Sequence, residues 1–460
     1  MPRLHAGFPE SMFSAAWSEA MKERFHDLAQ FVQSLARPGE VIASSFSAED
    51  SHFIRFNRSA VRQATAVRQA QWSLTLIQDG RRVDATTTLA GLGDADREQL
   101  RTLLASLRHA IVDAPKDPYL LWPETPVATE RKTQGELPDA EQVIDAVTAA
   151  GRGVDLVGLY AGGPIYKGFA NSLGQRNWQH VDNFNLDWCL YHDRDKAVKT
   201  AYAGSRWDPE VLSRRMAEAR QRVALLARPA RTLEPGRYRA FLAPAAVKEV
   251  LDMLCWGGFS LKNQRTKQSP LLRLSQNEAT LDPRVSISED IAQGLAPGFQ
   301  SDGFVRPAQV ALIREGKVAN ALVSPRSSRE YGVPTNGAND SEAPESMALA
   351  GGELPSAEAL RSLDRGLWVS NLWYLNFSDR SACRLTGMTR FATFWVENGE
   401  IQSPVNVMRF DDTIYRILGS ELESLTQEQE LLLDGGTYGG RNTVSVRTPG
   451  LLLRDFMLTL

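Results

Sequence analysis

The chain has 460 residues, of which 43% are hydrophobic and 23% are charged, as is ordinary for a folded globular protein. Lysine and arginine number 52 against 55 aspartate and glutamate residues, and this balance gives no electrostatic reason to expect a nucleic-acid partner. No apolar run approaches the roughly 20 residues that span a membrane, and no export signal is recognisable. We therefore expect a cytoplasmic protein of two domains, at roughly 100–200 residues each.

The three cysteines, Cys189, Cys255 and Cys383, are widely separated and odd in number. Neither a disulfide framework nor a paired-cysteine metal site can be assembled from this spacing, which is typical of a reducing compartment. Cys383 would be a nucleophile only with a base nearby in space, so a buried structural thiol is the simpler interpretation.

Helical and strand periodicity alternate along the first half of the chain. A helix is predicted to open at Asp208-Pro209, because aspartate caps a helix and proline suits its first turn. Other predicted helices cover residues 15–35, 94–112 and 138–150. Predicted strands cover residues 53–61, 72–77, 83–89, 154–160, 166–171 and 178–192. Turns are expected at Asp79-Gly80, where glycine accepts a positive φ, and at the Gly-Gly-Pro run 162–164.

A stretch with two prolines and a glycine, residues 228–236, precedes a half that is richer in strand patterns. We place the domain boundary there, which predicts an N-terminal domain over residues 1–232 and a C-terminal domain over residues 233–460. The elements predicted in the second domain are a strand over 238–243, a helix over 244–256, and hairpins pairing 310–313 with 318–323 and 391–396 with 401–407. Residues 324–352 are dense in turn-forming residues, and so long a loop is usually functional or disordered.

Signals for other kinds of site are weak. None of the six histidines pairs with another at a spacing of three to five residues. His180, Asp182 and His192 would share one face of their strand, which leaves two interpretations open: a metal site, or ordinary strand residues. The run 162–168 is similar to a phosphate-binding loop but lacks the Gly-Lys-Ser/Thr order, so a turn is favoured.

Four segments, taken in order and spacing, resemble the TldD/PmbA (TldE) family of metalloproteases along nearly the whole chain. The four segments are the strand pair 55–88, the turn 171–174, the run 301–339 and the hairpin 394–405. The third segment is the most specific and includes Arg326-Ser327-Ser328 and Thr335-Asn336-Gly337-Ala338-Asn339.

This resemblance implies an α+β fold, with N-terminal helices on an antiparallel sheet and a C-terminal, strand-rich, barrel-like domain. It also implies a connection to cytoplasmic metallopeptidases that cleave extended or unfolded peptides. TldD-type members pair with a TldE-type subunit. They carry His-Glu-x-x-x-His on a helix just inside the second domain, with a cysteine near the C-terminus that completes the metal shell.

The corresponding helix of this chain lacks those metal ligands. Alignment with the family places Lys248 and Met253 at the two histidine positions, while Glu249 occupies the glutamate position. An ammonium repels a metal ion and a thioether is poorly suited to hydrolytic zinc, so we expect no cofactor in this chain and zinc in a partner. The C-terminal run 435–440 has no cysteine either, and a lone glutamate on a helix is usually a solvated side chain.

The leading hypothesis is a TldE-like, non-catalytic subunit that pairs with a TldD-like homologue or with itself and captures unfolded peptide. Backbone pairing to an exposed strand would hold the peptide. The predicted substrate-binding residues are Arg326, Asn336, Asn339 and Trp373. Two alternatives remain open at this stage: a self-sufficient peptidase with an unrecognised site, and a stand-alone peptide-binding scaffold.

Overall fold

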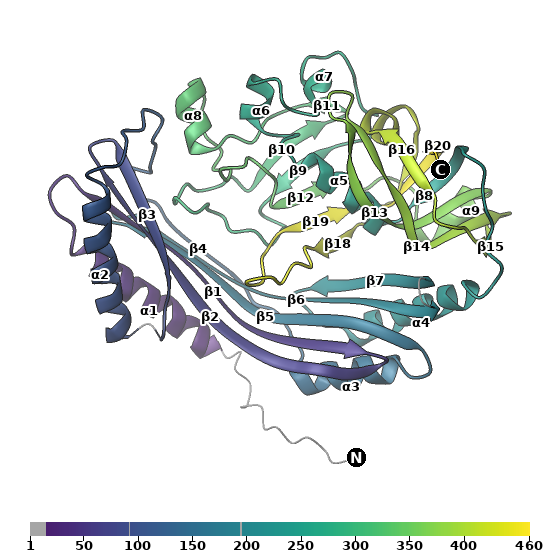
Figure 1. Cartoon of the computed structure of the whole chain (residues 1–460), viewed down its shortest axis with the longest axis horizontal. Coiled ribbons are helices and arrows are strands. Elements are labelled where there is room, and N and C mark those ends of the chain that lie inside the picture. Colours follow the sequence, from purple (N-terminus) through teal and green to yellow (C-terminus); the bar gives the residue numbers. More distant parts are fainter. Residues whose placement is uncertain (1–14, 92, 194–195) are drawn as a thin grey trace.

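The computed structural model describes residues 15–91, 93–193 and 196–460. In Figure 1 the N-terminal sheet runs along the lower half of the molecule and the C-terminal part lies above it. The strands of this sheet are β1 (Val41–Asn57), β2 (Ala60–Gln78), β3 (Arg81–Thr88), β4 (Ala128–Thr133), β5 (Asp155–Asn171), β6 (Arg176–Asp193) and β7 (Lys196–Gly204). The helices beside it are α1 (Ala15–Gln33), α2 (Asp94–Ala110), α3 (Ala140–Ala150) and α4 (Pro209–Leu225).

The sheet order is β3-β2-β1-β5-β6, and the two halves of β6 have different neighbours. The first half of β6 pairs in parallel with β4, and the second half pairs antiparallel with β7. The predicted antiparallel sheet is therefore confirmed except for β4, a strand that the sequence patterns did not reveal. β7 was also missed.

Strand alternation gives the sheet one apolar face and one polar face. On β6 the alternate residues Phe184, Leu186 and Trp188 are fully buried under α3 and α4. At the other end of the same face, Phe25 of α1 and Trp72 of β2 belong to a core shared with α2. Residues of the opposite parity on β6 face the C-terminal part, where the candidate site lies.

The C-terminal part contains a closed five-stranded barrel, built from residues that are all described. Its strands follow the order β13-β8-β20-β16-β14, and β14 pairs back to β13. A second sheet runs β11-β10-β9-β12-β19-β18. The mixed α+β fold with a barrel-like second half is thus confirmed.

The strands of this part are β8 (Gly236–Leu242), β9 (Ile287–Asp290), β10 (Gln309–Arg314), β11 (Lys317–Val318), β12 (Ser346–Leu349), β13 (Gly366–Asp379), β14 (Arg384–Glu397), β15 (Glu400–Pro404), β16 (Arg409–Thr413), β17 (Leu422–Leu425), β18 (Glu430–Leu433), β19 (Ser445–Thr448) and β20 (Leu451–Leu458). The helices are α5 (Pro244–Leu254), α6 (Leu261–Arg265), α7 (Leu272–Ser275), α8 (Pro325–Tyr331) and α9 (Ala359–Leu363), with single turns at Ser356–Glu358 and Arg416–Ser420. None of the described helices is long and apolar enough to cross a membrane.

Four local predictions are wrong in whole or in part. The strand predicted over residues 53–61 is broken by a turn at Arg58-Ser59, two non-glycine residues with φ near +50° and +58°. The turn predicted at 162–164 is absent, because β5 runs straight through it. Gly163 is needed there for close strand packing, since a Cβ would lie 2.1 Å from the Asp50 carbonyl oxygen of β1.

The long loop predicted over residues 324–352 is also partly wrong, because α8 and β12 form within it. The buried carboxylate of Glu342 organises this segment: it accepts hydrogen bonds from the Ser324 backbone N–H at 2.9 Å and from the Ser260 hydroxyl at 2.5 Å. The return strand predicted over 318–323 shrinks to the two residues of β11.

A buried ion pair ties α2 to the start of β1, and its removal should weaken the N-terminal sheet. Glu40 accepts two hydrogen bonds from Arg108, at 2.8 and 2.7 Å, which hold the pKa of that carboxyl below its usual 4.5. We expect Glu40→Gln to cost about 2 kcal/mol in the free energy of unfolding at neutral pH.

Because the folded pKa of Glu40 is lowered, its contribution is present above pH 4.5 and lost as the pH falls through the folded value. The difference between wild type and variant in urea titrations should therefore shrink below that pH. Glu98→Gln is the matched control: it breaks an exposed pair with Arg101 and should cost less than about 0.5 kcal/mol. Equal losses for the two variants would contradict the prediction.

Candidate functional site

A cleft of about 920 Å³ lies between the β7 edge of the N-terminal sheet and the C-terminal part. One wall consists of β6, β7 and α4, and the other of β8, α5 and β13, with the chain that follows β18 at the bottom. The lining is rich in charged side chains from both halves. The cleft is large enough for an extended segment of peptide but not for a folded domain.

Helix α5 places its charged residues in this cleft and its apolar residues in the core. Pro244 occupies the first turn, where its missing N–H costs no hydrogen bond. Val247, Val250 and Leu251 are fully buried, and this fixes the opposite face of the helix, with Lys248 and Glu249, toward the cleft. Lys248 and Asp252, one helical turn apart, form an ion pair with 2.5 Å between Nζ and Oδ2.

Met253 does not share this face. Its side chain is 4% exposed and belongs to the apolar core of the C-terminal part. The residue paired with Lys248 is therefore Asp252, one position earlier than the alignment with the family suggests. The cation that pairs with the Asp252 carboxylate is thus the Lys248 ammonium and not a metal ion.

Burial and neighbouring charges shift the pKa values of this group. Burial alone would lower the pKa of Lys248, but the carboxylates of Asp252 and Glu249 raise it above its usual value. Burial raises the pKa of Glu249, and the Lys248 ammonium partly offsets that effect. Asp434 also contributes a favourable charge to Lys248. An ammonium surrounded by carboxylates satisfies the local charge that a metal cation would otherwise supply.

The residues present here do not fit a zinc site. Within residues 15–91, 93–193 and 196–460 no three His, Cys, Asp or Glu side chains are grouped as metal ligands. His180 donates to or accepts from Asp182 at 2.8 Å on the sheet, without a third ligand. Burial raises the pKa of the Cys383 thiol to about 12, which makes this cysteine a poor nucleophile at neutral pH.

The segment 434–442 between β18 and β19, which we call the strap, crosses from the C-terminal part to the N-terminal sheet (Figure 1). Arg441 anchors it. The guanidinium donates to the Ser51 hydroxyl at 3.2 Å, the Gly163 carbonyl at 3.0 Å and the Asn183 carbonyl at 2.7 Å. Burial lowers the pKa of Arg441 to about 10, so the side chain stays charged at neutral pH.

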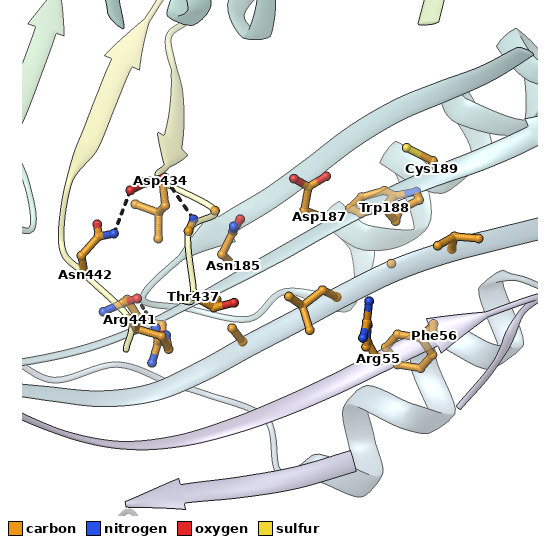
Figure 2. A pocket seen from close by; sticks show the side chains of 18 residues that line it. Arg55, Phe56, Asn185, Asp187, Trp188, Cys189, Asp434, Thr437, Arg441 and Asn442 are labelled. Atoms are coloured by element: carbon orange, nitrogen blue, oxygen red, sulfur yellow. Dashed lines mark hydrogen bonds between the residues drawn. The ribbon is translucent and has the colours of Figure 1, made fainter. Parts of the chain in front are cut away.

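The strap also borders a smaller cavity of about 290 Å³ next to the cleft. Figure 2 shows Asn185, Asp187 and Cys189 on β6 and Asp434 and Thr437 of the strap, all of which line this cavity. Asp187 and residues 434–436 line both spaces. The strap therefore fixes how the two spaces join.

The four predicted substrate-binding residues lie elsewhere and do not line the cleft. Asn336 bonds the backbone of Val323 and Ala321 at 2.9 and 2.8 Å, which holds its own loop together. Asn339 does the same through the backbone of Ala343, at 3.1 and 3.0 Å. A role for these two residues in binding stays a prediction.

Arg326 and Trp373 are at the surface. Arg326 on α8 pairs with Asp117 at 2.5 Å and lies over the ring of Tyr119. Trp373 on β13 is 42% exposed, with the Arg390 guanidinium 4.3 Å from its ring centroid. Of the residues singled out from the sequence, Lys248 and Glu249 are the ones that meet in the cleft.

Comparison with known proteins agrees with this geometry. Residues 235–460 match the family model described as the PmbA/TldA metallopeptidase C-terminal domain. TldE from Thermococcus kodakarensis is 14% identical, with a TM-score of 0.76, covering 95% of this chain and 100% of its own. A candidate modulator of a DNA gyrase from Thermotoga maritima is 17% identical, with the same coverage and TM-score.

A candidate modulator of DNA gyrase from Bacteroides thetaiotaomicron is 15% identical, covering 97% of this chain and 100% of its own at a TM-score of 0.72. No curated protein sequence matches the chain. Fold and cleft together define a metallopeptidase-related protein whose described residues form no metal site on the cleft helix. The chain belongs to the TldD/PmbA family.

Sequence reasoning missed most residues on the N-terminal side of the cleft. Asp187 lies on a strand that was predicted correctly, but the residues singled out on that strand were His180, Asp182 and His192. Arg441 has no local signal, because its partners come from β1, β5 and β6. The polar residues at alternate positions of β6 were the available clue to this side of the cleft. A strand that is buried on both faces rarely carries Asn and Gln without hydrogen-bond partners.

Removing the Arg441 guanidinium should loosen the strap. Arg441→Met leaves the buried acceptors of Asn183 and Gly163 without their donor, at an expected cost of about 3–5 kcal/mol in stability. Hydrogen exchange of the strap amides should also accelerate. Arg454→Met, an exposed arginine on β20, should change stability by less than about 0.5 kcal/mol. Slow strap exchange in the Arg441 variant would contradict this role.

The geometry of α5 predicts which pair of histidines would bind zinc. Lys248→His with Asp252→His places two imidazoles one turn apart on the cleft face, and we expect one equivalent of zinc by titration calorimetry. Lys248→His with Met253→His should bind no zinc, because position 253 faces the core. Zinc binding by the second variant and not the first would show that the helix faces have been misassigned.

Proposed function

We propose that this chain is the non-catalytic, TldE-like subunit of a TldD/TldE-type metalloprotease. The observation that carries the proposal is the Lys248–Asp252 ion pair on the cleft face of α5. A divalent cation would have to displace an ammonium that is already bonded to its carboxylate at 2.5 Å. The hydrolytic step, which needs a metal-bound water, therefore falls to a partner that carries His-Glu-x-x-x-His and zinc.

The role left to this chain is to bind unfolded peptide. β18 is the last strand of its sheet, and Glu430, Leu432 and Leu433 on it line the cleft. An extended peptide would add its backbone to this edge, as in other cases of strand addition. A folded substrate would not enter, which accounts for a preference for unfolded chains.

The partner is a TldD-like homologue, with self-association as the alternative assembly. All three cysteines are free thiols, in keeping with a cytoplasmic, reducing location. Affinity purification from the native host tests the partner, and cell fractionation tests the compartment.

The decisive experiment compares the purified chain, a metal-bearing homologue and their mixture on an unfolded peptide. The chain alone should hold less than one-tenth of an equivalent of zinc and cleave nothing. The mixture should cleave, and a His→Ala change in the partner's motif should abolish cleavage. Stoichiometric zinc together with cleavage by this chain alone would refute the subunit model. Recovery of homodimers only from the native host would refute the pairing.

A further inference from the structure

One wall of the cleft carries buried polar groups that have no partner within the described residues. Trp368, Ser370 and Asn371 of β13 line the cleft and are 7%, 5% and 7% exposed. The indole N–H, the hydroxyl and the amide oxygen of these residues make no hydrogen bond. Each such group costs about 1–3 kcal/mol, so their concentration on one wall indicates a ligand.

Arg222 of α4 lines the same cleft, and an aromatic ring orients its guanidinium, which has no hydrogen-bond partner among the described residues. Its guanidinium carbon lies 5.4 Å from the centroid of the Trp368 ring, which is itself stacked on Phe241 with centroids 4.5 Å apart. No hydrogen bond or ion pair joins Arg222 to another described residue. An aromatic platform of this kind leaves the in-plane N–H donors of the guanidinium available.

Arg215, about two turns earlier on the same helix, provides a contrast. Arg215 bonds the Ala201 carbonyl at 2.8 Å and the Glu430 carboxylate at 3.1 Å, so its charge is already matched. Burial lowers the pKa of Arg222, which is partly countered by the charges of Glu218 and Glu430. Those two carboxylates favour a singly charged ligand over a doubly charged phosphate.

We propose that Arg222, Trp368, Ser370 and Asn371 form a subsite for a peptide carboxylate, with the free carboxyl terminus as its occupant. The guanidinium binds the carboxylate in a two-point arrangement, which arginine geometry favours. The Asn371 amide oxygen accepts from a peptide N–H, while the Trp368 indole donates to a peptide oxygen. This subsite rests on the proposed peptide-binding role and adds the chemical group that the cleft recognises.

The test measures binding of three fluorescent, unstructured peptides of one sequence to the full chain by anisotropy. One peptide has a free carboxyl terminus, one is amidated, and one is amidated with a terminal glutamate that returns a carboxylate on a side chain. We expect amidation to weaken binding roughly 10- to 100-fold, as loss of charge-assisted hydrogen bonds does. The glutamate peptide should recover little of that loss.

Arg222→Gln should remove the discrimination between the free and amidated peptides, and Arg222→Lys, which keeps the charge but not the fork, should restore part of it. Arg214→Gln removes an exposed positive charge from the same helix and should keep the discrimination. Thermal melts by circular dichroism establish that each variant is folded.

Equal binding of the free and amidated peptides to wild type would overturn the subsite while leaving peptide capture intact. Full recovery by the glutamate peptide would overturn the assignment to the chain terminus. Binding of none of the peptides would overturn both the subsite and the proposed peptide-binding role.

Discussion

The buried guanidinium of Arg441 is the constraint on which the shape of the cleft depends. A buried cation destabilises a protein by several kcal/mol unless its donors are satisfied, and here acceptors come from β1, β5 and β6 at once. The same interaction binds the strap to the N-terminal sheet. Because the carbonyl of Gly163 takes part, the tight approach of β5 to β1 is also part of this arrangement. The two halves of the chain thus hold one geometry around the cleft.

The contact between the two halves is polar along the odd-numbered face of β6, whereas α4 and the barrel strands share an apolar core. On β6 the even-numbered residues from Phe184 to Leu190 fill the core under α3 and α4, whereas Gln179 and Asn183, of the other parity, bond groups of the C-terminal part. An apolar face would have closed on the C-terminal part and excluded a cavity. A hydrogen-bonded face instead keeps the halves apart where Asp187 and Asn185 line open space, which leaves a hydrated cleft.

Local signals in the sequence were sufficient wherever the determinant was local. The Asp208 cap and the Asp79-Gly80 turn are both where the sequence predicts them, because each depends on one or two residues. Gly163 was misinterpreted because a glycine is required there by the close approach of a neighbouring strand and not by a turn. The cleft face of α5 was predicted only in part: alignment supplied Lys248, but burial decides that Asp252, not Met253, lies beside it. The roles of Arg222 and Arg441 could not be predicted from the sequence, because their partners are distant in sequence.

The ion pair on α5 also balances the charge on this side of the helix. A metal site that loses its ligands one at a time leaves buried carboxylates without a cation, and uncompensated buried charge is strongly destabilising. Here the Lys248 ammonium lies among Asp252, Glu249 and Asp434, so the charge is balanced by a side chain that cannot activate water as a metal does. Selection for binding alone would retain the cleft with its charge balanced and would not fill it with apolar residues. This charge balance is the physical basis of our proposal that the cleft receives peptide while another subunit carries out the chemistry.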